Sequence, residues 1–309
     1  LLSFRQALLT DGHRDFAGTM ADNGIVLKNQ KQTEDFRQML RDYRDALVTR
    51  RAMSNLYNSM GWKENNTRFV LGETIIRNDE TGNTVEEASS LSSHANKSLH
   101  DMYGVGGSLQ DWTNGTGVLQ DNDLKAHMFA LNMGFAAPLF NFTGLKGLTV
   151  SLYGPTGGGK TLAQYFVQSI YGNPEKLHFA AKFTQNALFN RLAMYNNLPM
   201  TVDEVTMMPD KEVGDFLYNV SQGKDKARLT RSADERESKT WATPVIISTN
   251  VSLHSKLVSS GIETDAQAAR LLEVYMSPHD LFKKDTTAGQ EIYTHLMKNY
   301  GYAGREFVK

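Results

Sequence analysis

The sequence predicts an α/β fold, and three features of the chain lead to that prediction. Residues 148–153 form an apolar run of β type that breaks into a glycine-rich turn. An amphipathic stretch of helical period follows that turn. Two more apolar runs of strand length, 198–202 and 244–249, follow along the chain. Strands that alternate with helix-length segments are typical of a parallel sheet covered by helices.

The amino-terminal part of the chain has a different pattern. Its apolar residues recur at helical spacing between residues 31 and 60. The 309 residues, 40% of them hydrophobic, are enough for two domains. We therefore expect a mostly helical N-terminal accessory and oligomerisation domain over residues 1–125, and the α/β domain over residues 126–309.

Composition excludes several classes of protein. No apolar run approaches the ~18–20 residues that span a bilayer, and the N-terminus lacks the basic start and apolar block of a signal peptide. The absence of cysteine excludes disulfides and thiolate metal sites. We expect a cytoplasmic protein with no membrane partner. The net charge of −1 excludes a globally basic nucleic-acid binder, so any contact with nucleic acid must be local. Because the chain begins at Leu1 rather than Met, we expect a fragment of a longer polypeptide.

The predicted elements before residue 140 follow from local patterns. Thr33 is a suitable N-cap for the first helix, whose apolar positions are Phe36, Met39, Leu40, Tyr43 and Leu47. Residues 61–77 predict two short strands around a polar turn. Residues 78–122 are rich in Asn, Ser, Gly, Asp and Thr and predict loops or a linker. A helix resumes at Leu124 and ends near Pro138.

The glycine-rich turn after residue 153 is the most specific motif of the chain. It consists of Gly154, Pro155, Thr156, Gly157, Gly158, Gly159, Lys160 and Thr161, a complete G-x-x-x-x-G-K-[ST] phosphate-binding loop. The glycines let successive backbone N–H groups converge on phosphate oxygens, and the helix that follows adds its N-terminal N–H groups. Lys160 can reach the β- and γ-phosphates, and the Thr161 hydroxyl can ligate Mg²⁺. A plain glycine-rich loop is the alternative, but the strand before the motif and the helix after it favour binding of a nucleoside triphosphate, ATP, with Mg²⁺.

A second strand is expected to end in acidic residues beside this loop. Residues 198–202 form a short apolar run, and Asp203 and Glu204 follow it. Asp203 would orient Mg²⁺ through water, and Glu204 would polarise the attacking water. Adjacent carboxylates are also common on solvated turns, so the alternative is a surface turn.

A third strand, residues 244–249, ends at Asn250. An amide beside the γ-phosphate can position the hydrolytic water and respond to loss of the phosphate. The alternative is that Asn250 only starts a turn. The order of phosphate loop, acidic strand and Asn strand favours the catalytic assignment.

One arginine stands at a helix–strand junction further along. The segment DAQAARLLEV, residues 265–274, predicts a short helix that runs into an apolar strand, with Arg270 at the junction. Such an arginine could project across a subunit interface and stabilise developing charge on the γ-phosphate in a neighbouring site. An ordinary surface ion pair is the alternative.

A basic segment lies between the acidic strand and the Asn strand. Residues 223–239 carry six cations, and the four that alternate with small or apolar residues are Lys224, Lys226, Arg228 and Arg231. A β-hairpin here could present these charges to the phosphate backbone of single-stranded DNA. The alternative is a solvated charged surface.

The order and spacing of these motifs resemble the superfamily-three helicases and the related phage and plasmid primase–helicase modules, a branch of the AAA+ ATPases. The QAARLLEV stretch is similar to the segment that carries the trans-acting arginine in that group, and residues 223–239 fall where it has a DNA-gripping hairpin. Residues 61–72, the helix 126–138 and the closing NYGYAGREFV also resemble a helicase-like domain family of uncharacterised function found in mobile elements.

The resemblance implies a P-loop NTPase core of AAA+ type that forms a homo-oligomeric ring, a hexamer. It implies ATP-driven movement along single-stranded DNA in phage or plasmid replication, with a primase or polymerase domain on the same longer chain. Two departures stand out: residues 198–201 are less apolar than the acidic strand usually is, and no lid helix with an arginine is evident. The alternatives are an AAA+ ATPase that remodels or loads protein partners, and a small-molecule kinase or isolated NTPase.

Overall fold

The structure is a computed structural model that describes residue 9 and residues 16–49, 56–57, 59–88, 90–91, 101–181, 184–205, 208–225, 228–229, 235–236, 238–261, 269–282 and 287–309. Its contacts divide the chain into two compact units. The first comprises Leu1–Asn58 and Ser89–His100, and the second comprises Ser59–Ala88 and Asp101–Lys309.

The described residues of the first unit form two α-helices, α1 (Phe16–Asp22) and α2 (Gln30–Thr49). Phe16 and Met20 of α1 are buried against Phe36 and Leu40 of α2, as the apolar spacing of α2 predicts. The helical pattern predicted up to residue 60 is wrong at its end, because residues 56–57 form a strand. The short strands β1 (Leu56–Tyr57) and β6 (Ser90–Leu91) pair in parallel.

The second unit is built on a five-stranded sheet, which confirms the predicted α/β class. Its strands are β7 (Gly147–Tyr153), β8 (His178–Ala180), β9 (Met200–Asp203), β12 (Thr243–Thr249) and β13 (Leu271–Tyr275). The spatial order is β13-β7-β12-β9-β8, and every neighbouring pair is parallel. The carboxyl ends of β7, β12 and β9 therefore meet at one edge of the sheet, where the loops that follow them come together.

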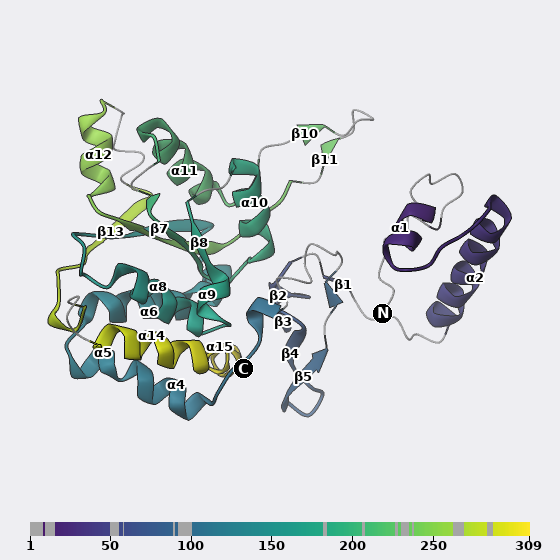
Figure 1. The fold of residues 1–309 in the computed structure, drawn as a ribbon, viewed down its shortest axis with the longest axis horizontal. Coiled ribbons are helices and arrows are strands. Elements are labelled where there is room, and N and C mark those ends of the chain that lie inside the picture. Colours follow the sequence, from purple (N-terminus) through teal and green to yellow (C-terminus); the bar gives the residue numbers. More distant parts are fainter. Residues whose placement is uncertain are drawn as a thin grey trace. The chain divides into compact units, whose positions relative to one another are not determined.

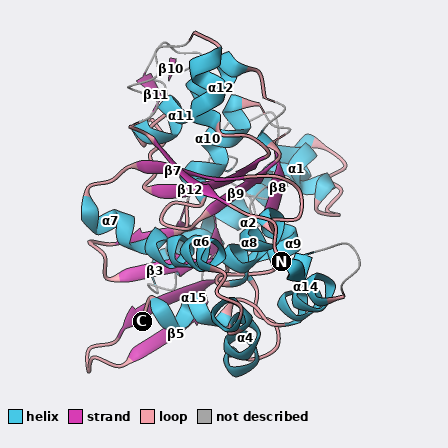
Figure 2. Cartoon of the chain, turned by 90° about the vertical axis from the view of Figure 1, so that its left-hand side faces the viewer, coloured by secondary structure: helices cyan, strands magenta, loops and turns pink. Residues whose placement is uncertain are grey.

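Helices cover both faces of this sheet (Figures 1 and 2). One face carries α6 (Lys125–Ala136) and α8 (Lys160–Ser169), and the other carries α10 (Gln185–Met194), α11 (Asp210–Gln222) and α12 (Leu253–Ser259). A further helical layer lies beyond α6 and α8 and comprises α4 (Leu109–Thr116), α5 (Val118–Asp121), α14 (Ala288–Lys298) and α15 (Tyr302–Phe307). Short helical turns, η2 (Asp101–Tyr103), η3 (Ala137–Leu139), α7 (Phe140–Thr143), α9 (Pro174–Leu177) and η5 (Asp280–Phe282), complete the described helices.

The core below the sheet holds the phosphate-loop helix α8 in place. Val150 and Leu152 of β7 are fully buried against Ala163 and Val167 of α8 and Ala130 of α6. Burial of each large apolar side chain contributes roughly 1.5–3 kcal/mol. The residues that end β7 and begin α8 are therefore anchored on both sides of the loop that joins them.

A small antiparallel sheet also belongs to the second unit, in the order β2 (Gly61–Lys63), β3 (Arg68–Leu71), β4 (Thr74–Asn78) and β5 (Thr84–Ala88). The two strands predicted over residues 61–77 are thus confirmed, with a third strand, β2, before them. The indole Nε1 of Trp62 donates to the Pro138 carbonyl at 3.1 Å, and Arg305 pairs with Glu86 at 2.9 Å. These contacts attach the small sheet to η3 and α15.

The loop or linker predicted over residues 78–122 is wrong for much of that stretch, which contains β5, η2, α4 and α5. The indole of buried Trp112 in α4 donates to Ser169 Oγ at 2.9 Å. Leu119 of α5 is buried in one cluster with Phe166 of α8 and Leu296 of α14. Long-range packing therefore stabilises helices whose local sequence favours turns. The compact unit accordingly does not divide at residue 125, where we expected a domain boundary.

Candidate nucleotide-binding site

The predicted phosphate-binding loop joins β7 to α8 at the carboxyl edge of the sheet. Gly154, Gly157 and Gly159 have φ angles of 146°, 91° and 69°. Side chains are strained in that part of the φ/ψ map, so the path of the loop requires glycine. A Cβ on Gly154 or Gly158 would also come within 2.4 or 2.6 Å of the Met276 carbonyl oxygen. The segment after β13 therefore packs directly on the loop.

Two rings support the loop at its last glycine. A Cβ on Gly159 would lie 2.6 Å from His127 Nε2 and 2.6 Å from the ring of Phe282. His127 comes from α6 and packs on Phe282 with ring centroids 5.1 Å apart. Burial lowers the pKa of His127 to about 4, although the backbone of Gly158 and Gly159 opposes the shift. His127 is therefore neutral at physiological pH.

Lys160 is the first residue of α8. Its Nζ donates to the carbonyl oxygens of Gly154 at 2.6 Å and Pro155 at 2.9 Å, so the ammonium group lies over the loop. Partial burial lowers the pKa of Lys160, and the nearby Asp203 carboxylate opposes that shift. The amino group is positioned to exchange these carbonyl contacts for phosphate oxygens.

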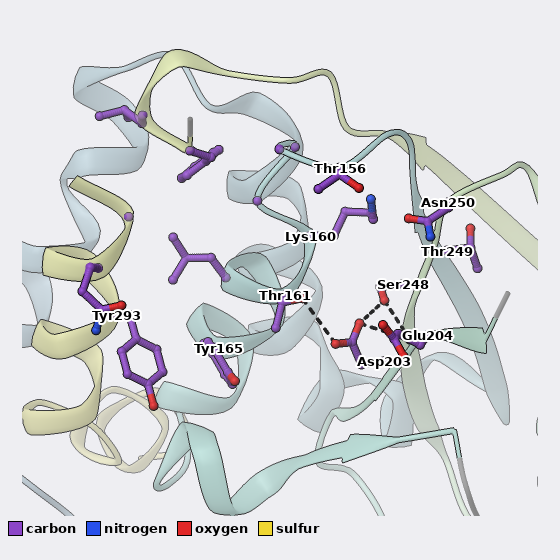
Figure 3. Close-up of a pocket in the computed structure, with 18 residues that line it drawn as sticks. Thr156, Lys160, Thr161, Tyr165, Asp203, Glu204, Ser248, Thr249, Asn250 and Tyr293 are labelled. Atoms are coloured by element: carbon purple, nitrogen blue, oxygen red, sulfur yellow. Dashed lines mark hydrogen bonds between the residues drawn. The ribbon is translucent and has the colours of Figure 1, made fainter. Parts of the chain in front are cut away.

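Asp203, at the end of β9, is held by three donors (Figure 3). The Thr161 hydroxyl donates to its Oδ2 at 3.3 Å, and the Ser248 hydroxyl of β12 donates to Oδ1. The backbone N–H of Glu204 also donates to Oδ1, at 3.1 Å. The two residues predicted to serve Mg²⁺, Thr161 and Asp203, are therefore in contact.

Glu204 occupies an unusual backbone conformation. Its φ is 58°, in the left-handed region that non-glycine residues rarely adopt, and its N–H also donates to Ser248 Oγ at 3.1 Å. Such a conformation costs of order 1–3 kcal/mol and is found most often at functional sites. This geometry turns the chain directly after Asp203 and leaves Glu204 at the wall of the cavity.

A cavity of about 700 Å³ brings the site residues together. It is lined by Thr156, Gly157, Gly158, Gly159, Lys160, Thr161, Leu162, Tyr165, Asp203, Glu204, Ser248, Thr249, Asn250, Leu281, Phe282, Gly289, Gln290 and Tyr293. Figure 3 shows Lys160, Asn250 and Glu204 around one end and Tyr165 and Tyr293 at the other. Asn250 directly follows β12, which lies between β7 and β9 in the sheet, so Asn250 is near both the phosphate loop and the acidic residues.

Several wall residues were not predicted from the sequence. Ser248 comes from β12, whereas Phe282, Gln290 and Tyr293 come from η5 and α14, more than a hundred residues after the loop. The helix α14, which contributes Gln290 and Tyr293 to the cavity wall, contains no arginine. No local motif marks these residues, because packing of α14 on α8 brings them to the site.

The cavity can accommodate a magnesium ion with a nucleotide. Among the described residues, no group of three His, Cys, Asp or Glu side chains could hold a metal by itself. Mg²⁺ instead commonly uses one or two protein oxygens together with substrate phosphates and water. The Thr161 hydroxyl and the Asp203 carboxylate, both beside Lys160, fit that arrangement.

Arg270 lies away from this cavity. It precedes β13, whose first residue, Leu271, is level with Thr149 of β7, whereas the loop follows Tyr153. At ~3.3 Å per residue, Arg270 and the loop are separated by roughly 15 Å along the sheet. The guanidinium Nε donates to Ser221 Oγ at 2.9 Å, and the group lies 5.3 Å from the Tyr218 ring. The strand predicted after Arg270 is confirmed, whereas the short helix predicted before it falls mostly on residues 262–268, outside the described residues.

The hairpin predicted in the basic segment is present in the backbone. Strands β10 (Arg228–Leu229) and β11 (Glu235–Arg236) pair antiparallel, with Arg228 opposite Arg236. Lys224 is exposed, and its backbone pairs with Thr240 at the base of the segment. Lys226 and Arg231 lie outside the described residues.

The comparisons with known proteins agree with this architecture. Residues 2–241 match the family model described as Domain of unknown function (DUF927). The chain belongs to the DUF927 family. This confirms the resemblance to a helicase-like domain family of uncharacterised function. No curated protein matches the sequence.

Among solved structures, this DUF927 chain is similar to one described as "SCCmec type IV Cch - active helicase", with a TM-score of 0.69 and 20% identity. The match covers 97% of this chain and 53% of the other, so the chain spans about half the length of that helicase. At this identity the match establishes the fold, which is an α/β P-loop ATPase fold.

Two further matches are more distant. The NrS-1 C-terminal region gives a TM-score of 0.40 at 14% identity, covering 80% of this chain and 56% of that one. JCV helicase gives 0.36 at 10% identity, covering 65% and 54%. These scores are too low to establish a shared fold. No helix in the described part of the chain has the length and apolar character needed to cross a membrane.

Proposed function

We propose that this chain is the ATPase module of a ring-forming helicase or translocase of AAA+ type that moves along single-stranded DNA. One observation carries the proposal. Side chains that follow three neighbouring parallel strands meet at one cavity: Lys160 and Thr161 after β7, Asp203 and Glu204 at the end of β9, and Asn250 after β12.

These residues have separate tasks in hydrolysis of ATP. Lys160 and the loop N–H groups bind the phosphates, and Thr161 and Asp203 serve Mg²⁺, which supplies charge neutralisation when bound. Glu204 accepts a proton from the attacking water, and Asn250 orients that water. The left-handed backbone conformation at Glu204 supports this assignment, because strained residues cluster at functional sites and Glu204 lines the cavity.

The other end of the cavity suits a nucleoside. Tyr165 and Tyr293 provide aromatic surface there (Figure 3), and planar bases pack well on such surface. Both ends together match the two parts of ATP, the charged triphosphate and the aromatic base.

The residues described around the cavity suggest that a group from a neighbouring subunit completes the site, as in a ring of subunits, a hexamer by resemblance. None of the described residues that line the cavity is an arginine, although an arginine beside the γ-phosphate commonly stabilises the negative charge of the transition state. Arg270 is too distant to reach the loop of its own chain. A neighbouring subunit's Arg270 is our candidate for that charge.

The hairpin β10–β11 is the proposed DNA contact. In a ring, Lys224, Lys226, Arg228 and Arg231 would be repeated around the channel, so a nearly neutral chain could still present a strong positive field. By resemblance, the setting is phage or plasmid DNA replication in the bacterial cytoplasm, with a primase or polymerase domain on a longer chain. Residues 1–125 are proposed to include the accessory and oligomerisation surface.

The decisive experiment measures ATP hydrolysis with and without single-stranded oligonucleotides. Lys160→Ala, which should not hydrolyse ATP, is the inactive control. The proposal predicts stimulation by single-stranded DNA and directional strand displacement. If turnover is indifferent to nucleic acid, the helicase assignment is wrong. The alternative of an AAA+ ATPase that remodels or loads proteins then stands. A small-molecule kinase would instead transfer phosphate to an acceptor, a reaction that the Asn250 position does not favour.

A further inference from the structure

A buried glutamine behind the phosphate loop has a fixed orientation. Gln164 of α8 is fully buried, and its Nε2 lies 3.0 Å from the Val202 carbonyl oxygen and 3.2 Å from that of Ile246. Carbonyl oxygens only accept hydrogen bonds, so the side-chain atom that faces both must be the amide nitrogen. The amide oxygen of Gln164 must therefore point the other way.

That oxygen determines where a histidine carries its proton. Gln164 Oε1 lies 2.9 Å from His178 Nε2, at the start of β8. An amide oxygen cannot donate, so His178 Nε2 must carry a hydrogen. The ring of Tyr165 packs on the His178 ring with centroids 4.9 Å apart. The position and the donor atom of His178 are both constrained.

The His178 nitrogen that donates to Gln164 also lies near the carboxylate of Asp203. Nε2 lies 3.7 Å from Asp203 Oδ2, too far for a direct hydrogen bond but close enough for the N–H dipole to attract the carboxylate. Only 14% of the His178 side chain and 19% of the Asp203 side chain are exposed, which strengthens such an attraction. The other carboxylate oxygen, Oδ1, is held by Ser248 and the Glu204 N–H.

We propose that His178, oriented by Gln164, is a positioning residue for Asp203. The Ser248 hydroxyl and the Glu204 N–H donate to Oδ1 of the carboxylate, and His178 Nε2 attracts Oδ2. This leaves Oδ2 beside Thr161, in the place where it can serve Mg²⁺. The inference rests on the proposed role of Asp203 toward Mg²⁺. Partners that orient metal ligands in this way typically change metal affinity 10–100-fold when removed.

The test compares two substitutions whose side-chain amide groups are the same but differ in how far their N–H groups reach. In His178→Gln the side-chain nitrogen can take the place of Nε2, whereas in His178→Asn the shorter side chain cannot reach it. Binding of Mn²⁺ to the protein–nucleotide complex, measured by electron paramagnetic resonance, reports metal affinity without turnover. Nucleotide affinity in EDTA reports whether each variant is folded, and exposed His254→Asn is the matched control.

We expect Mn²⁺ affinity to fall about 10–100-fold in His178→Asn and to stay within about threefold of the parent in His178→Gln. Nucleotide affinity in EDTA should be unchanged in both. Equal Mn²⁺ affinity in the two variants, whether both high or both low, would overturn the inference. Asp203→Asn tests the role of Asp203 separately from that of His178. If this variant keeps its Mn²⁺ affinity, Asp203 does not serve the metal, and the positioning role of His178 is then wrong as well.

Discussion

The Thr161 hydroxyl lies 3.3 Å from the Asp203 carboxylate, although 42 positions separate the two residues in the chain. Thr161 is the last residue of the phosphate loop that follows β7, and Asp203 ends β9, which is separated from β7 in the sheet by β12. Their contact places a hydroxyl and a carboxylate beside Lys160, where an ion bound to triphosphate would lie. The predictions below depend on this arrangement.

Lys160→Ala should reduce ATP turnover by about 10²-fold or more, because the γ-phosphate loses the cation of the loop. The free energy of unfolding should change little, since the hydrogen bonds of the Lys160 amino group go to backbone carbonyls of the loop, which water can replace. Steady-state hydrolysis assays and chemical denaturation measure the two effects. Normal turnover in the variant would show that the loop does not bind the reacting phosphate.

Glu204→Gln should keep nucleotide affinity while turnover falls about 10²–10⁴-fold, because water loses its proton acceptor and Asp203 remains. The backbone N–H contacts of Glu204 do not depend on its side chain. Exposed Glu212→Gln in α11 is the control. A matched loss of nucleotide affinity would contradict the proposed division of tasks between Asp203 and Glu204.

Mixtures of Arg270→Ala and Glu204→Gln subunits should recover part of the activity that each variant lacks alone. An intact catalytic site in one subunit would then meet an intact arginine from its neighbour, a contribution of roughly 10³ or more in related systems. Turnover is measured after subunit exchange has been demonstrated by fluorescence. If the mixtures are as inactive as either variant alone, the proposed action in a neighbouring site is wrong. Arg270 would then be a structural residue that contacts Ser221 and Tyr218.

Lys226→Ala combined with Arg228→Ala should weaken binding of single-stranded DNA and reduce the slope of log affinity against log salt by roughly 0.7 per lost contact. Basal ATP hydrolysis should persist, because the proposed phosphate, metal and water contacts come from Lys160, Thr161, Asp203, Glu204 and Asn250 and not from the basic segment. The paired control removes two exposed cations of the other compact unit, Lys28 and Lys31. An unchanged salt slope would identify the segment as a solvated surface and favour the protein-remodelling alternative.

Gly159→Ala should lower the free energy of unfolding by about 1–3 kcal/mol more than Gly144→Ala does. Both glycines have positive φ, 69° and 77°, so alanine is strained at either position. Only at Gly159 would the new Cβ meet other atoms, His127 Nε2 and Phe282, both at 2.6 Å. Denaturant unfolding compares the two variants, and nucleotide affinity should fall in Gly159→Ala alone. Equal destabilisation would mean that the two rings yield without cost.

The sequence by itself determined the phosphate loop, the two strands that end at the acidic residues and at Asn250, and the hairpin between these strands. These features depend on local chemistry: glycine where the backbone turns, runs of apolar residues in buried strands, and polar residues where strands end. It could not predict α4 and α5, because their stability comes from Trp112 and Leu119 packing on distant helices.

Only the tertiary structure decided which side chains share the cavity. Gln290 and Tyr293 reach it because α14 packs on α8, and His178 lies near Asp203 because β8 pairs with β9. It also decided that Arg270 lies far from its own loop, through the register of β13 on β7. Such contacts join residues far apart in sequence. Their geometry depends on the order and register of strands, which no local pattern encodes.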